Sequence, residues 1–324
     1  EALLGFAAVL VLAFLRMPLG VALGLVGVLG FTYLSGFRAA ISSAARLVID
    51  SGQSYGLSVV PLFILMGLMV ERGGMAKELY RAAYVFLGHR KGGVAMSAVG
   101  ACAGFGAICG SSLATAATMG QVALPELRRY GYPDSLSTGA LAAGGTLGIL
   151  IPPSVILVIY AILAEQNIAK LFVAAFIPGI LAAIGYMIAI SIWVRVRPNA
   201  AAVTPRVPWA QRMIMIGKVW PVILIFVAVV GGIYAGIFTP TEAAAVGAAG
   251  TFLVALFSGE MSWSRLSEAI LSTASSSAMI FLIILGASIY NNFLSLTQLP
   301  QDASAWVGAL QVSPWVILSI VLLM

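Results

Sequence analysis

The stretch from Val94 to Leu124, VAMSAVGACAGFGAICGSSLATAATMGQVAL, is apolar and dense in Gly, Ala, Ser and Thr. Basic segments flank it at 71–93 and 125–134, and such segments favour the cytoplasmic side of a membrane. Two complete helical crossings of a bilayer need about 40 residues, and this stretch is shorter. We therefore expect a re-entrant helical hairpin that enters from the cytoplasm and turns back at Cys109-Gly110-Ser111-Ser112. Backbone at such a turn is tolerated where it is buried in protein or lines a wet cavity.

The composition of the whole chain also indicates a membrane protein. Of the 324 residues, 61% are hydrophobic and only 9% are charged, and the mean hydropathy is +1.06. A soluble domain carries about 25% charged residues, which it needs to cover its surface. The apolar runs 171–194, 219–237 and 269–296 are each long enough to cross a bilayer as a helix. We therefore predict an all-α polytopic membrane protein.

The net charge of +6 does not indicate a nucleic-acid partner, because the basic residues lie between apolar runs. The segment 195–218 carries five basic residues and no acid, which predicts a cytoplasmic loop. Within it, 209–220 has the pattern of an amphipathic helix on the membrane surface. Cys102 and Cys109 lie in apolar sequence and are expected to be buried free thiols.

A second interruption lies at 144–154, GGTLGILIPPS, inside the apolar run 136–163. Pro152 and Pro153 have no N–H group, so carbonyls one turn earlier, near Gly145 to Ile149, lose their helical partners. Na⁺ prefers oxygen ligands, which unwound carbonyls and helix C-terminal ends supply, whereas the N-termini of half-helices can hold a carboxylate. We therefore expect a helix broken at Pro152-Pro153 that faces the hairpin tip and forms an ion site with it.

Acidic residues are missing from the apolar runs, which argues against a proton-driven carrier. The acids Glu71, Glu126, Asp134, Glu165 and Asp302 lie in loops or at the ends of spans. The sequence also contains no phosphate-binding loop and no zinc-hydrolase motif. We therefore predict that the chain is not an enzyme and uses no cofactor, with Na⁺ as coupling ion.

Two further patterns are structural. The run 61–67, PLFILMG, resembles 280–286, IFLIILG, and the charge rule orients the two runs oppositely, as in an inverted repeat. The run Thr239-Pro240-Thr241-Glu242 predicts a helix start, with Thr239 as the cap, Pro240 in the first turn and Glu242 closing a capping box.

Four stretches taken in order resemble a known family. They are GSSLATA at 110–116, GYP at 131–133, GGTLGILIPPS at 144–154 and GIFTPTEA at 236–243. Together they are similar to the large membrane subunit of tripartite ATP-independent periplasmic (TRAP) transporters, over nearly the whole chain. The resemblance implies a sodium-driven elevator-type carrier in the bacterial inner membrane. It also implies a small four-helix membrane subunit and a periplasmic solute-binding protein as partners, and an organic acid such as a C4-dicarboxylate or a sialic acid as substrate.

The resemblance also assigns candidate site residues. The predicted sodium ligands are Ser111, Ser112, Gly145, Thr146, Gly148, Ile149 and Pro152. The predicted substrate contacts are Ser112, Ala114, Thr115, Pro153 and Ser154.

The same resemblance suggests a division of the chain. We expect N-terminal scaffold helices at 1–56, a first repeat and transport domain at 57–194, the cytoplasmic basic loop at 195–218, scaffold helices at 219–268 and the start of a second inverted repeat at 269–324. The family's second hairpin and second broken helix would follow the position of Met324, so this chain alone is expected to form an incomplete substrate site.

Alternative functions predict different behaviour. A divalent-anion/sodium symporter shares hairpins and inverted repeats but works without a binding protein. A channel needs a continuous polar path, and the sequence shows none.

Overall fold

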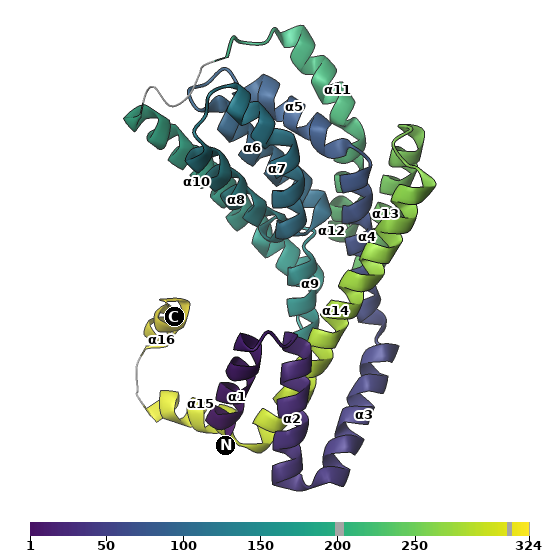
Figure 1. Cartoon of the computed structure of the whole chain (residues 1–324), viewed down its shortest axis with the longest axis vertical. Helices are drawn as coiled ribbons and strands as arrows, with labels where there is room; N and C mark the ends of the chain where they lie inside the picture. Colours follow the sequence, from purple (N-terminus) through teal and green to yellow (C-terminus); the bar gives the residue numbers. More distant parts are fainter. Residues whose placement is uncertain (198–203, 310–312, 324) are drawn as a thin grey trace. The chain divides into compact units, whose positions relative to one another are not determined.

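A computed structural model describes residues 1–197, 204–309 and 313–323, and all regular structure within these ranges is helical (Figure 1). The predicted loop 195–218 and the predicted segment 269–324 each lie partly outside the described residues. The helices are α1 (Ala2–Phe14), α2 (Leu19–Ser35), α3 (Phe37–Gln53), α4 (Val59–Arg72), α5 (Met75–Leu87), α6 (Gly93–Cys109), α7 (Ser112–Arg129), α8 (Asp134–Leu150), α9 (Val155–Leu163), α10 (Ile168–Val196), α11 (Trp209–Phe226), α12 (Gly232–Tyr234), α13 (Pro240–Phe257), α14 (Trp263–Leu296), α15 (Leu299–Ala309) and α16 (Pro314–Leu323).

Several of these helices are long and apolar enough to cross a membrane. Five pass by length and composition: Tyr55–Arg72, Ile168–Val196, Trp209–Tyr234, Pro240–Phe257 and Trp263–Leu296. The pair α8 and α9 would form a sixth, bent span. On α10, Ile177 and Leu181 are 67% and 62% exposed, as expected of side chains that face lipid. The fold class of a polytopic helical membrane protein is therefore confirmed.

The ends of several helices follow directly from the sequence. Thr239 caps α13: its hydroxyl accepts a hydrogen bond from the Glu242 amide at 3.3 Å, and the Glu242 carboxylate accepts one from the Thr239 amide at 2.8 Å. The predicted capping box is thus confirmed. The break between α1 and α2 lies at Arg16, which has a φ of +64°, and Pro18 precedes the first residue of α2.

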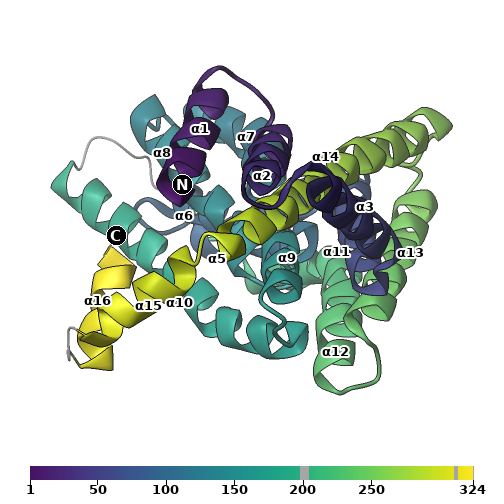
Figure 2. The ribbon, with the colours of Figure 1, turned by 90° about the horizontal axis from the view of Figure 1, so that it is seen from below.

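The chain forms two compact units, which are described separately. The first comprises residues 1–54 and 278–324. Within it, α1 packs on α2 and α2 on α3, and the three lie side by side in both views (Figures 1 and 2). Its core contains Val9, Val26, Tyr290 and Phe293. A Cβ on Gly27 would lie 2.8 Å from the Tyr290 amide nitrogen, so glycine allows close helix contact there.

The second unit comprises residues 55–277 and is built around α6. This helix contacts α4, α5, α7, α8 and α10, and nearly all of its residues are buried. Phe63 of α4 and Phe105 of α6 are among its fully buried side chains. A helix that is apolar on every face is typical of a protein interior.

Two segments differ from the sequence expectation. The basic segment 71–93 is expected from the sequence to be a loop, but it contains α5. The apolar residues Ala76, Tyr80 and Leu87 follow one another at helical spacing, which favours a helix there. The predicted surface helix 209–220 does not end before the following span. The chain remains helical from Trp209 to Tyr234 through a π-helical turn at Val227–Gly231. Lys218 alone does not interrupt a helix, since lysine is a good helix former.

Candidate functional site

The hairpin formed by α6 and α7 turns at Gly110 and Ser111, as the sequence predicts. Gly110 has a φ of +65°, a left-handed conformation that glycine adopts without strain. Its amide donates to the Gly106 carbonyl at 2.9 Å and closes the end of α6. The Ser111 hydroxyl accepts from the Ala114 amide at 3.4 Å and caps α7. The tip therefore brings the C-terminus of one helix next to the N-terminus of the next.

The break between α8 and α9 has the same arrangement. The helix α8 ends at Leu150, and residues Ile151 to Ser154 form an irregular segment that turns the axis by 43°. The Ser154 side chain is fully buried, and its hydroxyl accepts from the Leu157 amide at 3.4 Å, which caps α9. Here too, a helix C-terminus and a helix N-terminus meet at one point.

The hairpin tip and the helix break touch each other through the main chain. The Val155 amide donates to the Gly110 carbonyl at 3.4 Å. A Cβ on Gly110 would lie 2.8 Å from the Pro153 carbonyl oxygen, so only glycine fits there. Two helix C-termini and two helix N-termini therefore converge. The negative partial charge of the helix C-termini favours a cation, and the positive partial charge of the helix N-termini favours a carboxylate.

Glycines allow the hairpin to lie directly on α8. A Cβ on Gly106 would lie 2.6 Å from the Gly148 Cα, and one on Gly145 would lie 2.7 Å from the Ala116 Cβ. A Cβ on Gly148 would lie 2.6 Å from the Thr115 hydroxyl and 2.7 Å from the Ser111 carbonyl oxygen. The contact thus places Gly148 against two oxygen atoms of the hairpin.

The free carbonyls in α8 begin later than the sequence suggests. Leu147 still has a partner, because its carbonyl accepts from the Ile151 amide at 2.9 Å. A helical partner for the Gly148 and Ile149 carbonyls would be the N–H of Pro152 and Pro153, which prolines do not have. Gly145 and Thr146 lie within α8. The expected range of freed carbonyls, Gly145 to Ile149, is therefore corrected to Gly148 and Ile149.

Thr115 adds a side-chain oxygen to this contact. The side chain is fully buried, and its hydroxyl has no nitrogen or oxygen partner among the described residues, although the Cys109 thiol, a weak hydrogen-bonding group, lies beside it. A buried hydroxyl without a partner is costly unless a ligand satisfies it. It lies against Gly148, one of the two residues whose carbonyls lack a helical amide partner.

The other predicted site residues have mixed positions. Ser112 and Ala114 lie in the first turn of α7 and are partly buried, while Pro152 and Pro153 are buried at the break. The side chain of Thr146 points away from the hairpin. Its hydroxyl donates to the Ala143 carbonyl at 2.6 Å and also lies 3.0 Å from the Tyr186 hydroxyl of α10. Its hydroxyl is therefore not available at the hairpin contact.

Sequence reasoning missed two glycines. A Cβ on Gly67 would lie 2.6 Å from the Cys109 carbonyl oxygen, so α4 also supports the tip. Gly106 supports it from within the hairpin, against α8. Both lie in apolar sequence, and the only signal available was their small size.

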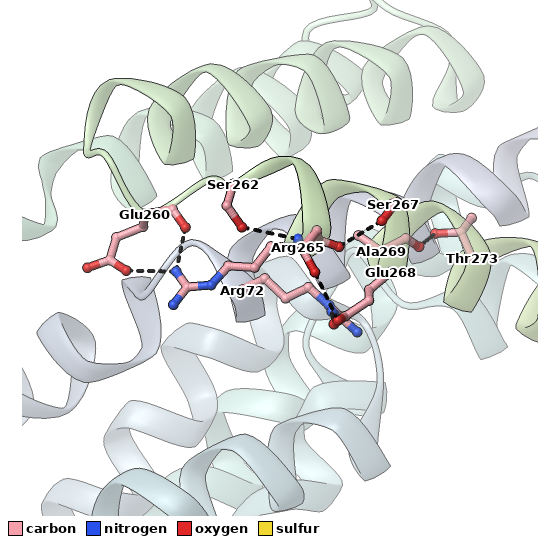
Figure 3. A network of polar contacts seen from close by, with 9 residues as sticks. Arg72, Glu260, Ser262, Arg265, Ser267, Glu268, Ala269 and Thr273 are labelled. Atoms are coloured by element: carbon pink, nitrogen blue, oxygen red, sulfur yellow. Dashed lines mark hydrogen bonds and ion pairs between the residues drawn. The ribbon is translucent and has the colours of Figure 1, made fainter.

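Several charged side chains of the second unit lie together around another cavity. Arg72 of α4 pairs with Glu268 of α14, and Arg265 pairs with Glu260 at 2.9 Å (Figure 3). These two pairs border a cavity of about 400 Å³ that Thr118 and Lys77 also line. In the part of the chain that the structure describes, no group of three or more His, Cys, Asp or Glu residues could hold a metal ion.

Comparison with known proteins identifies relatives along the whole chain. Residues 6–324 match the family described as "Tripartite ATP-independent periplasmic transporter, DctM component". The C4-dicarboxylate TRAP transporter large permease protein DctM of Pseudomonas aeruginosa is 38% identical over 282 residues, which cover 87% of this chain and 66% of that relative.

Two other relatives show how far the likeness extends. The C4-dicarboxylate TRAP transporter large permease protein DctM of Rhodobacter capsulatus is 32% identical over 99% of this chain and 76% of its own length. The sialic acid TRAP transporter large permease protein SiaM of Vibrio cholerae is 30% identical over 96% of this chain and 72% of its own length. The chain thus spans about two thirds to three quarters of the length of these relatives.

Proposed function

Because this chain belongs to the DctM family of large permease components of tripartite ATP-independent periplasmic transporters, we propose that it serves in the sodium-coupled uptake of a small organic acid. Members of this family are transporter permeases and not enzymes. Accordingly, the contact between the hairpin tip and the broken helix has the role of a transport site, and sodium is bound there as transported ion.

One observation carries the sodium part of the proposal. The Thr115 hydroxyl is buried against Gly148, where α8 runs out of amide donors for its carbonyls, and the group beside it is the weakly hydrogen-bonding Cys109 thiol. Two neutral oxygens, the Thr115 hydroxyl and the Ser111 carbonyl, therefore lie against Gly148, and we infer that the last carbonyls of α8 complete the set. No acid is needed at such a site, which suits a monovalent hard cation. Full burial favours an ion ligand over a substrate contact for Thr115.

The carboxylate part of the proposal rests on the two helix N-termini. The first turns of α7 and α9 begin at Ser112 and Val155, and both start at the same main-chain contact. Free amides at helix N-termini attract carboxylates. The relatives named for C4-dicarboxylate and for sialic acid support an organic acid as substrate.

The partners and the mechanism follow from the family. We assign the chain to the bacterial inner membrane as a multi-pass subunit, working with a small four-helix membrane subunit and a periplasmic solute-binding protein. In this scheme the hairpin and broken helix travel together as part of an elevator-type transport domain within 57–194. The remaining helices at 1–56 and 219–268 form the scaffold, and 269–324 begins the second repeat.

Uptake into vesicles tests the proposal. The full-length protein is reconstituted with its small subunit and binding protein, and labelled succinate or sialic acid uptake is measured against sodium concentration. Thr115→Val removes the hydroxyl at nearly constant volume, and Thr115→Ser keeps it. We expect Thr115→Val to raise the half-saturating sodium concentration roughly tenfold, equivalent to about 1.4 kcal/mol, and Thr115→Ser to stay close to wild type.

Two results would contradict the proposal. Uptake that is unchanged without a sodium gradient would remove the coupling. Uptake that proceeds without the binding protein would favour a symporter of the divalent-anion type instead.

A further inference from the structure

We propose that a cavity between the α5–α6 turn and the last turns of α10 binds an anionic phospholipid, with its phosphate held by Arg90, Lys91 and Arg195. The inference rests on the chain being a membrane protein and is independent of the sodium site and of the substrate. The cavity has a volume of about 600 Å³ and lies within the second unit.

The three cations come from two segments that pack together. Gly92 has a φ of +79° and forms the turn between α5 and α6. A Cβ on Gly92 would lie 3.2 Å from a methyl carbon of Ile190 and 3.2 Å from one of Val194, so the turn rests on α10. This packing brings Arg90 and Lys91 of the turn to the same cavity as Arg195 of α10.

The positive charge of this cavity is not neutralised by the described residues. No acid lines it, and none of the three cations forms an ion pair within the ranges that the structure covers. In contrast, the cavity beside Arg72 also contains Glu71, Glu260 and Glu268. The N-terminus of α6, which begins at Gly93, adds positive partial charge beside Lys91. Three unpaired cations around one space predict an anionic ligand.

A nearby histidine lies close to one of these three cations, Arg90. Loss of solvent around the ring, followed by the charges of Arg212, Arg206 and Arg90, lowers the pKa of His89.

The other half of the lining is apolar and distinguishes a lipid from a free anion. Ile184 and Ile188 lie on α10, a helix long and apolar enough to span the bilayer, and they are 47% and 53% exposed. Met96 adds a third apolar wall from α6. A soluble phosphate would use only the cations, whereas a phospholipid uses the cations for its phosphate and the isoleucines for the start of its acyl chains.

The experiment measures lipid binding to the purified full-length protein by native mass spectrometry. Phosphatidylglycerol and phosphatidylcholine are titrated separately. The site variant is Arg90→Gln/Arg195→Gln. The matched control is Lys77→Gln/Lys218→Gln, which removes the same charge from two exposed lysines outside this cavity. Lys91→Gln alone serves as a milder site variant in case the double variant folds poorly.

We expect wild type and the control to bind phosphatidylglycerol more tightly than phosphatidylcholine. Each cation near an anionic lipid accounts for roughly a fivefold change in affinity, so the double variant should lose roughly 25-fold and Lys91→Gln roughly fivefold. Equal losses in the site and control variants would overturn the proposal. So would displacement of phosphatidylglycerol by millimolar inorganic phosphate, since that result would indicate a site for a free anion.

Discussion

Replacing Gly148 with alanine should weaken sodium binding while leaving the protein folded. The new methyl group would lie 2.6 Å from the Thr115 hydroxyl and 2.7 Å from the Ser111 carbonyl oxygen. The hydroxyl can rotate away, but the carbonyl belongs to the backbone of a capped helix and cannot. The α6–α7 hairpin and α8 must therefore move apart by several tenths of an ångström at the proposed ion site.

The magnitude follows from the cost of overpacking. Inserting a methyl group into a well-packed contact costs about 1 to 3 kcal/mol. If the methyl group raises the free energy of the sodium-bound state by this amount, the half-saturating sodium concentration rises roughly 5- to 150-fold. The assay is sodium-dependent uptake in proteoliposomes, with thermal unfolding of the same preparation as the measure of folding.

The matched control lies in the same helix. A Cβ on Gly139 would have no atom within 4 Å, so Gly139→Ala adds a methyl group without a clash. This variant should keep wild-type sodium dependence, and it should be slightly more stable because alanine is the better helix former. An unchanged sodium requirement in Gly148→Ala, or an equal change in both variants, would refute the reasoning.

Three other predictions test separate features. Pro152→Ala supplies the amide that the end of α8 lacks, so it should occupy a freed carbonyl and raise the sodium requirement roughly 2- to 10-fold, whereas Pro178→Ala in α10 should not. Thr239→Ala removes the cap of α13 and should cost about 0.5 to 2 kcal/mol in thermal unfolding, with sodium dependence retained. A double-mutant cycle on Arg72 and Glu268 should give a coupling of less than about 1 kcal/mol, further reduced by salt, because both side chains are partly exposed.

The two interruptions could be predicted from the sequence because each contains residues that end a helix for local reasons. Glycine with small hydroxyl residues at 109–112 marks a turn, and two consecutive prolines at 152 and 153 end a helix wherever they occur. The hairpin followed from the basic segments on both flanks together with the length, since 94–124 is too short for two crossings. These features depend on residues close together in the chain, so one sequence is enough to find them.

The contacts across the site could not be predicted in the same way. The helix α6 has small or apolar residues on every face, so its sequence has no periodicity to tell which face meets α8 and which meets α4. For the same reason Gly67 and Gly106 were not distinguished from other glycines. The direction of Thr146 depends on Tyr186, forty residues away, and only the packed structure shows it.

The bond from the Val155 amide to the Gly110 carbonyl has a consequence for motion. It joins the hairpin tip to the start of α9, so the two cannot move apart without breaking a main-chain hydrogen bond. We therefore expect the tip and the α9 N-terminus to shift together. Leu113, 84% exposed beside the tip, is free of this contact.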